Sequence, residues 1–363
     1  MMSAVRHRPV DRCPYATYNL HPYLNSPHAA DPSYAQILAL VEATAGMAVK
    51  SGAGGIGVGL SRPRPGQVET ATQETTDGRV TDEIIHTPKG DLIRTTRAAP
   101  DGRARVTRHF VSSDDDIEKL LSLPYEPPEL DTSGIRAMLE AVGDRGIVFA
   151  GFDDPMYSIA SLFHFEDFCV RVHTDLAAIK RMVDWAFERC AENTKLLVRA
   201  CTGLDCVFHT SGPELCTPPM TSPDVFAKLV TPYLRALIDI IHASGFLAAI
   251  HCHGRVREVL PHILDTGADL LEPIEPPPQG DITLAELLGQ AGDRICLMGH
   301  VQDQDFYTAP PGYMTRWVQQ IAATVGGRTG YTMTPTCTPF EFPCSDTYRR
   351  NYIEWLEAAD RLL

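Results

Sequence analysis

The chain has 363 residues, of which 44% are hydrophobic and 21% are charged, so it can bury a full core as two domains or as one large α/β barrel with an insertion. Its 46 acidic residues outnumber the 32 basic ones, which gives a formal charge of -14, and no basic run offers the lysines and arginines that duplex binding needs. This balance argues against nucleic acid and against an anionic membrane surface as partners.

Export and membrane signals are not visible in the sequence. No stretch approaches the roughly 18–20 apolar residues that span a bilayer. The opening MMSAVRHRPVDRCPY has no apolar core of a secretory signal, and the ten cysteines include no CxxC pair. We therefore expect a cytoplasmic protein with reduced thiols.

The first part of the chain, residues 1–114, is expected to be an accessory region packed on the catalytic domain. The pattern predicts one helix over residues 34–50. The extended segments EIIHTP and DLIRTT follow, separated by Lys89-Gly90, which indicates a β-hairpin.

Three glycines of this region, Gly52, Gly54 and Gly57, satisfy the GxGxxG pattern. That fingerprint binds a dinucleotide only where it follows a strand and opens a helix. Here the preceding segment is expected to be helical and the following one extended and polar, so no dinucleotide site is predicted.

Residues 115–363 alternate between short apolar runs and helices. The runs show no apolar/polar alternation, which is typical of strands buried on both faces; they span residues 146–152, 204–210, 246–252, 268–274, 294–300 and 329–335. Helices are predicted over 175–201, over 223–244, and after a capping box formed by Thr283 and Glu286.

Repeated strand–helix units are compatible with an open doubly wound sheet and with a closed barrel. Polar residues follow nearly every predicted strand, and in a barrel these carboxyl ends form one ring that carries the chemistry. We therefore predict a (β/α)8 TIM barrel over residues 115–363, with an N-terminal helical and β-hairpin excursion.

The strongest chemical signal is the sequence His251-Cys252-His253-Gly254 at the end of a predicted strand. Residues two apart leave a strand on the same side, so the two imidazoles converge while Cys252 points away, and Gly254 allows a turn. Converging imidazoles suit a metal, zinc above all. A pair of hydrogen-bonding histidines without metal, or a purely structural pair, is the alternative.

A catalytic zinc needs a third protein ligand and sometimes a fourth. Cys337, in the turn after the last strand, is the best-placed thiolate, and Glu214 is the carboxylate candidate; His209 and His300 are alternative ligands. The predicted metal ligands are therefore His251, His253, Cys337 and Glu214.

Other polar strand ends are assigned to catalysis and to substrate binding. His209, Glu272 and His300 are the predicted catalytic residues, as general acids or bases or as partners that orient a ligand. Asp153, Asp154 and Glu275 are the predicted substrate-binding residues. The aspartates precede Pro155 and could instead cap a helix, and the glutamates could be solvated loop acids.

The C-terminal two thirds resembles the uroporphyrinogen decarboxylase superfamily, nearest to its corrinoid-dependent methyltransferase branch. The resemblance rests on seven segments and on an N-terminal RPVDR opening at residues 8–12; the segments are HTSGPE (209–214), SPDVF (222–226), HCHG (251–254), TGAD (266–269), EPIEP (272–276), GDRI (292–295) and LMGH (297–300).

The resemblance implies a zinc held by a His-x-Cys pair and a distant Cys, where it activates a thiol acceptor or helps position a methyl donor. His251 matches the first ligand and Cys337 the last, whereas His253 stands where the family has cysteine and makes the site harder and more positively charged. It further implies methyl transfer between a small molecule and a methyl-corrinoid (cobalamin) bound to a partner carrier protein.

Three other functions stay open at this point. The first is a metal-independent decarboxylase or other lyase acting on a carboxylated small molecule, although the Arg-rich N-terminal motif of the decarboxylases is absent and their Gly-His-Gly turn is replaced around Cys337. The second is a metal-dependent hydrolase, whose His-x-His pair would belong on the first strand. The third, a non-catalytic binding module, fits poorly with so dense a polar ring.

Overall fold

The computed structural model describes residues 1–23, 26–57, 59–100 and 103–363. Its main sheet has eight parallel strands in the order β1-β2-β7-β8-β9-β10-β11-β12. They are β1 (Ala16–Tyr18), β2 (Gly46–Ser51), β7 (Gly146–Phe152), β8 (Val207–Ser211), β9 (Leu247–His251), β10 (Leu270–Ile274), β11 (Cys296–Val301) and β12 (Tyr331–Pro335).

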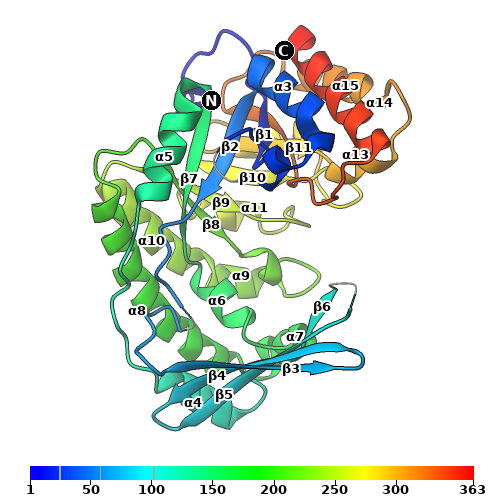
Figure 1. Cartoon of the computed structure of the whole chain (residues 1–363). Coiled ribbons are helices and arrows are strands. Elements are labelled where there is room, and N and C mark those ends of the chain that lie inside the picture. Colours follow the sequence, from blue (N-terminus) through cyan, green and yellow to red (C-terminus); the bar gives the residue numbers. More distant parts are fainter. Residues whose placement is uncertain (24–25, 58, 101–102) are drawn as a thin grey trace.

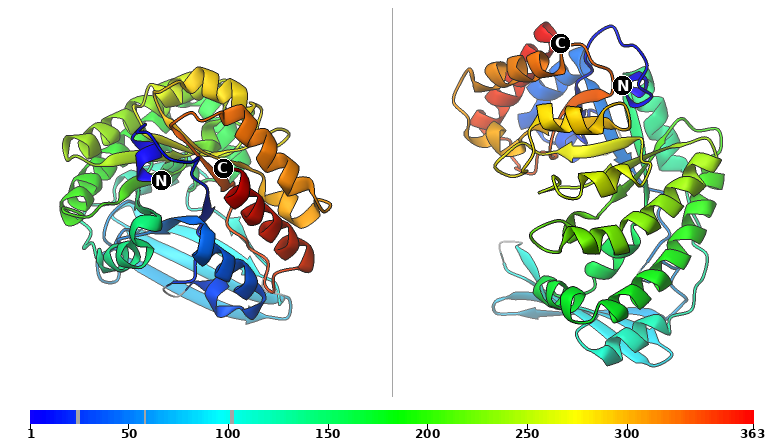
Figure 2. Two further views of the ribbon diagram at one scale, coloured as in Figure 1. Left: turned by 90° about the horizontal axis from the view of Figure 1, so that it is seen from above. Right: turned by 180° about the vertical axis from the view of Figure 1, so that it is seen from behind.

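The two edges of this sheet meet beside β1 and β12. Tyr15 bridges to Met333 in parallel, and the Met333 amide donates to the Pro14 carbonyl at 2.9 Å. The view from above shows the resulting ring of strands surrounded by helices (Figure 2). The predicted (β/α)8 barrel is confirmed.

Helices surround the barrel, and most of them bury apolar side chains against the strands or against one another. They are α1 (Met2–Val5), α2 (Pro27–Ala30), α3 (Ala35–Thr44), α5 (Ser133–Val142), α6 (Pro155–Ala160), α7 (Phe165–Thr174), α8 (Leu176–Ala200), α9 (Pro223–Leu229), α10 (Thr231–Ala243), α11 (Leu260–Leu264), α12 (Leu284–Ala291), α13 (Asp303–Thr308), α14 (Tyr313–Val325) and α15 (Asp346–Leu362). Inside the barrel, a second cluster from seven of its strands includes Ala48, Phe149, Ala249 and Met298.

The sequence predicted most of these elements from residue 146 onward. Each of the six apolar runs contains a barrel strand, and the helix predicted over 175–201 is α8. The capping box is formed, since the Glu286 amide donates to Thr283 Oγ1 and the Thr283 amide donates to Glu286 Oε2 at 2.9 Å. The helix predicted over 223–244 is divided at Val230, because Pro232 has no amide hydrogen to continue the hydrogen-bond ladder.

The prediction of one helix over residues 34–50 is wrong in its second half. Helix α3 ends at Thr44, and Gly46–Ser51 is β2, which pairs with β7 from Met47 to Ser51. Burial of Met47, Ala48 and Val49 between two neighbouring strands and the helical layer overrides their helix-like pattern. Strands β1 and β2, which come from residues 1–114, also belong to the barrel sheet.

The glycine pattern at Gly52, Gly54 and Gly57 therefore follows a strand, contrary to the expectation from sequence. It opens no helix among the described residues, because 52–57 and 59–67 contain none. The second condition for a dinucleotide fingerprint is thus absent.

A separate antiparallel sheet forms the excursion from the barrel. It contains β3 (Val68–Thr75), β4 (Gly78–Thr87), β5 (Gly90–Ala98) and β6 (Ala104–Arg108) in sequence order. The predicted hairpin is β4–β5, closed by the pairing of Thr87 with Gly90. Strands β3 and β6 were not predicted, because every residue in them is exposed and neither shows an apolar face. In Figure 1 this sheet lies at the end of the molecule remote from both termini.

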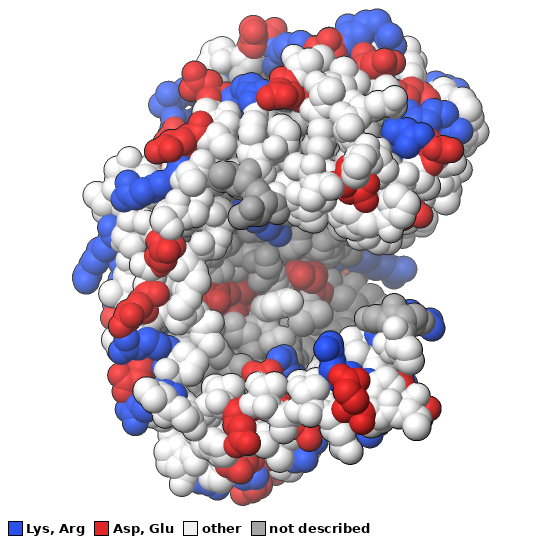
Figure 3. Space-filling view, viewed as in Figure 1, with Lys and Arg blue, Asp and Glu red and all other residues white. Residues whose placement is uncertain are grey.

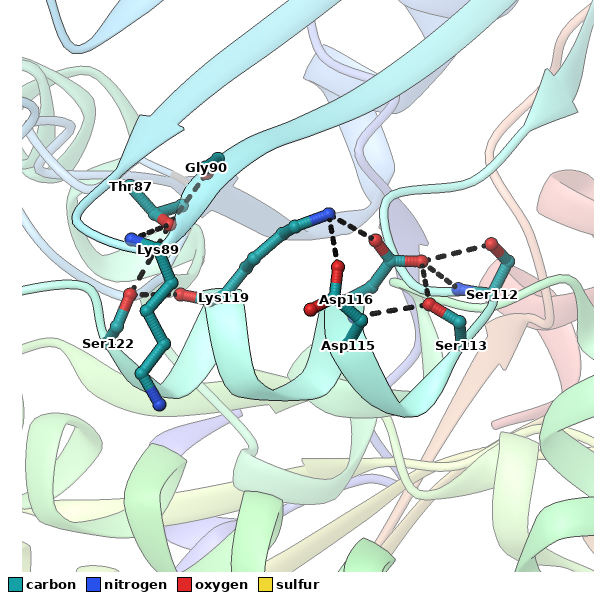
Figure 4. A network of polar contacts seen from close by, with 9 residues as sticks. All are labelled: Thr87, Lys89, Gly90, Ser112, Ser113, Asp115, Asp116, Lys119 and Ser122. Carbon is teal, nitrogen blue, oxygen red and sulfur yellow. Dashed lines mark hydrogen bonds and ion pairs between the residues drawn. The ribbon is translucent and has the colours of Figure 1, made fainter.

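Helix α4 (Asp114–Leu121) fastens the hairpin to the rest of the protein (Figure 4). Ser122 Oγ donates to Thr87 Oγ1 at 3.3 Å, and Lys119 Nζ lies 2.8 Å from Asp115 and 3.3 Å from Asp116. Asp116 also accepts hydrogen bonds from two serines that precede the helix. The space-filling view shows a deep hollow between this sheet and the barrel, with acidic side chains on its inner wall (Figure 3).

Among the described residues, no helix combines the length and the apolar character that crossing a membrane requires.

Candidate active site

A compact group of three buried side chains lies at the carboxyl ends of β8, β9 and β10. In the described part of the chain, it is the one set of three His, Cys, Asp or Glu residues whose donor atoms all lie within 4.8 Å of one another, and it consists of His209, His251 and Glu272. Glu272 Oε1 lies 2.7 Å from His251 Nδ1 and is also hydrogen-bonded to His209 Nε2. Neighbouring strands hold the group together, because Glu272 pairs directly with His251 in the β9–β10 register.

Burial and the charges of neighbouring side chains have opposite effects on the pKa values in this group. Burial lowers the pKa of His209 to about 4, so its imidazole is neutral at physiological pH. Burial alone would raise the pKa of Glu272, but the adjacent histidines outweigh it and hold that pKa well below its usual range. The group is therefore an ionised carboxylate that accepts hydrogen bonds from its neighbours.

Tyr18, from the end of β1, completes the surroundings of this carboxylate. Its hydroxyl donates to Glu272 Oε1 at 3.1 Å and lies 3.3 Å from His251 Nδ1. The Lys50 ammonium, from β2, lies 5.2 Å from the centre of the Tyr18 ring. Neither residue was predicted, because the strands that carry them, β1 and β2, could not be recognised from the sequence. Recognition of β2 would have placed Lys50 among the polar residues at the strand ends.

His251 and His253 converge as predicted, with ring centroids 4.6 Å apart and planes at 81°. Cys252 between them is fully buried in the hydrophobic core. His253 Nδ1 lies 3.2 Å from Glu275 Oε1, and the Gly254 amide donates to Glu275 Oε2 at 2.7 Å. Gly254 has a φ of +86°, so glycine supplies the left-handed turn that brings its amide to the carboxylate.

Each imidazole of the pair is thus bound through Nδ1 to its own glutamate, His251 to Glu272 and His253 to Glu275. Neither Nε2 atom has a hydrogen-bond partner among the described residues. Burial would lower the pKa of His253, but Glu275 outweighs it and raises that pKa. In this geometry each glutamate orients one histidine.

The other two predicted ligands, Cys337 and Glu214, lie outside the compact group. Glu214 is in a 3-10 turn after β8; its Oε2 is buried without a partner, and burial raises the pKa of the carboxyl to about 7. Cys337 is half-buried after β12, and burial raises its pKa. Both charges act on Lys50 and on Tyr18, so both residues belong to the same end of the barrel.

His300, the third predicted catalytic residue, is in a different environment. It ends β11 with a φ of +75°, and its ring stacks on Trp317 with centroids 5.9 Å apart. The Trp317 indole donates to the His300 carbonyl at 2.9 Å. Burial lowers the pKa of His300 to about 4, and its side chain makes no hydrogen bond to the compact group within the described residues.

Asp153 and Asp154 follow β7 and line a cavity of about 440 Å³ beside the compact group. Asp154 also caps helix α6, because its Oδ1 accepts from the Tyr157 amide at 2.6 Å, as one interpretation of the sequence had it. The cavity is further lined by Lys50 and His209, which connects it to the histidines.

The family model of uroporphyrinogen decarboxylase (URO-D) matches residues 95–343. The chain belongs to the URO-D family. The matched segment contains β7 to β12 and every predicted site residue, whereas Tyr18 and Lys50 lie outside it.

Solved structures with similar folds include a methyltransferase from Methanosarcina mazei, which is 16% identical and has a TM-score of 0.58 over 99% of this chain and 97% of its own. D-psicose 3-epimerase from Clostridium cellulolyticum H10 is 10% identical, with a TM-score of 0.39 over 69% of this chain and 85% of its own. No curated protein matches the sequence. At these identities, the first structure shows that this URO-D family chain shares its fold over nearly its whole length.

Proposed function

We propose that the protein is a zinc-dependent methyltransferase that moves a methyl group between a small molecule and a corrinoid carried by a partner protein. The observation that carries the proposal is that two converging imidazoles are each bound through Nδ1 to a glutamate. Metal-bound histidines usually donate their second ring N–H to a carboxylate, which fixes the tautomer and aims the free nitrogen at the metal.

The donor set suits zinc. With Glu272 and Glu275 holding Nδ1, the Nε2 atoms of His251 and His253 are the free donors, and Cys337 is the proposed thiolate ligand, with Glu214 as the fourth. Burial lowers the pKa of His251, which favours the neutral imidazole that a metal needs. The compact group of His209, His251 and Glu272 is a second possible set of metal ligands. A metal bound there would have to displace the hydrogen bonds of Glu272 to both histidines.

Bound zinc supplies a Lewis acid at the barrel mouth. The protein's own residues then have separate roles. Glu272 orients His251 and is itself held by Tyr18 and His209, while Glu275 orients His253. Lys50 supplies positive charge near these carboxylates. We assign His300, on β11 next to β10, to a proton-transfer role.

The hollow between the barrel and the four-stranded sheet supports docking of a corrinoid carrier protein (Figure 3). It opens toward the strand ends where the histidines lie, so a carried cobalt could approach them there. The same proposal places the enzyme in the cytoplasm, with the small molecule in the cavity lined by Asp153 and Asp154.

Metal content tests the proposal. Untagged protein should contain one zinc per chain, and the variants His251→Ala, His253→Ala and Cys337→Ser should each lose most of it. Cys252→Ala is the matched control, because its side chain faces the core. Loss of zinc in His209→Ala with full retention in His253→Ala would instead assign the compact group as the ligands. Transfer itself is measured as demethylation of methylcobalamin followed by its absorbance.

One observation favours a second function, a metal-independent decarboxylase or lyase for a small carboxylated substrate. Glu272 is hydrogen-bonded to both His209 and His251 without a metal, and burial raises the pKa of Asp154 and Glu214 to about 7, a range suited to acid–base work. Untagged wild-type protein free of any metal, yet active after chelation, would select this function.

A further inference from the structure

The cavity beside the compact group has an acidic end and an apolar wall. It holds about 440 Å³, and Lys50 and His209 line the side toward the histidines. The apolar wall consists of Ile56, Leu130, Phe149, Phe152 and Leu197, and the acidic end of Asp153, Asp154, Asn193 and Thr194.

Polar atoms at the acidic end lack partners. Asp154 uses Oδ1 to cap helix α6, but its Oδ2 is buried without a hydrogen bond, and the residue is 2% exposed. Thr194, 1% exposed, also has an unpartnered hydroxyl. Asn193 cannot serve Asp154, because its amide donates to the Leu60 carbonyl at 3.0 Å and its oxygen accepts from Tyr125.

No positive side chain neutralises these carboxylates in the described part of the chain. Neither Asp153 nor Asp154 forms an ion pair there; burial raises the pKa of Asp153 to about 6, against a smaller opposing effect of the Asn193 side chain. Lys50 lines the same cavity, but the charges acting on it are those of Glu272, Glu214 and Cys337. A buried carboxylate without a partner is costly, so a ligand that brings both charge and N–H donors gains the most at this position.

We propose that this cavity binds a small organic amine in its ammonium form. The ammonium donates to Asp154 Oδ2 and to Asp153, and the hydrocarbon part lies against Phe149 and Phe152. A neutral ligand brings no opposite charge to the buried Asp154 carboxyl, which then keeps its proton, and an anionic ligand would be repelled by the ionised form. The inference rests on the proposed function in one respect: the amine is then the small molecule that carries or receives the methyl group.

Binding is measured by calorimetry on the full chain with two probes of the same shape. N-methylbenzylamine is a cation at neutral pH, and benzyl methyl ether replaces its ammonium by an ether oxygen. We expect the amine to bind at least tenfold more tightly than the ether. Asp154→Asn and Asp153→Asn should each weaken the amine at least tenfold and leave the ether unchanged.

Asp175→Asn is the matched control, because Asp175 caps helix α8 in the same way but is exposed. Asparagine retains the capping function, so each variant should keep its circular dichroism spectrum. If Asp154→Asn does not fold, Asp153→Asn carries the test alone. Equal binding of the two probes, no binding of the amine, or full amine affinity in the aspartate variants would overturn the inference.

The methyltransferase proposal and the inference of amine binding can be refuted independently of each other. Amine binding requires neither metal nor corrinoid, so a protein that binds N-methylbenzylamine through Asp153 and Asp154 but contains no zinc refutes the methyltransferase proposal alone. A zinc protein indifferent to the amine refutes only the inference about the cavity.

Discussion

Glu272 and His251 lie directly opposite each other on adjacent parallel strands, with Glu272 Oε1 2.7 Å from His251 Nδ1. Strand register fixes this pair, because a shift of either strand by one residue would turn its member of the pair away from the barrel interior. Tyr18 and His209 contact the same carboxylate oxygen from two further strands. The carboxylate therefore links the ends of β1, β8, β9 and β10.

Replacement of Glu272 by Gln should weaken both the fold and the metal site. A neutral amide is a poorer acceptor for three buried donors, so we expect a loss of about 1–3 kcal/mol in the free energy of unfolding. Zinc affinity should fall roughly 10–100-fold, because His251 loses the partner that orients it. Urea denaturation and a zinc titration measure the two effects. Glu258→Gln, on the surface, is the control, and unchanged zinc affinity in Glu272→Gln would remove Glu272 from its assigned role.

Asp154 should make the protein less stable as the pH rises. Burial raises its pKa to about 7, so between about pH 4 and pH 7 the folded protein retains a proton that the unfolded chain releases. The free energy of unfolding therefore falls across this range, by at most about 4 kcal/mol for three pKa units.

Asp154→Asn removes this contribution and keeps the helix cap. Its stability relative to wild type should rise from pH 4 to pH 7 and stay level above pH 7. Urea denaturation at pH 5 and pH 8 measures the difference. An advantage of the variant that is the same at both pH values would show that the carboxyl titrates normally in the folded protein.

Leu92 should anchor the four-stranded sheet to α4. It is fully buried, whereas most of this sheet is exposed. Leu92→Ala should therefore cost roughly 2–5 kcal/mol locally and speed amide hydrogen exchange in β4 and β5 before it affects the barrel strands. Val106→Ala, at an exposed position of β6, should leave exchange unchanged. Equal acceleration throughout the barrel would mean that sheet and barrel unfold as one unit.

The strands from residue 146 onward could be predicted because each is a short apolar run buried on both faces. Strand β1 could not, because three residues, Ala16–Tyr18, carry too little pattern. In β2, Met47 to Val49 continue the apolar sequence of the helix before them, and only pairing with β7 makes them a strand. Tyr18 and Lys50 were not predicted as site residues for the same reason. A residue at the end of a strand can be assigned to the ring of polar side chains only when that strand is recognised.

Within the site, alternation along one strand was enough to predict the convergence of His251 and His253. The assignment of their partners was less complete. Sequence placed Glu272 and Glu275 near the histidines, but the register of β9 and β10 decides that each glutamate holds one ring through Nδ1. The unpartnered Oδ2 of Asp154 had no signal in the sequence, because it depends on how α8 packs against β7.

Zinc content of the untagged protein tests the central claim most directly. Elemental analysis by mass spectrometry of wild type, His251→Ala, His253→Ala, Cys337→Ser and Cys252→Ala gives the ratio of metal to chain. The account predicts about one zinc in wild type and in Cys252→Ala, and a small fraction of that in the other three, each with an unchanged circular dichroism spectrum. Wild-type protein without metal, or full zinc in His251→Ala, would contradict it.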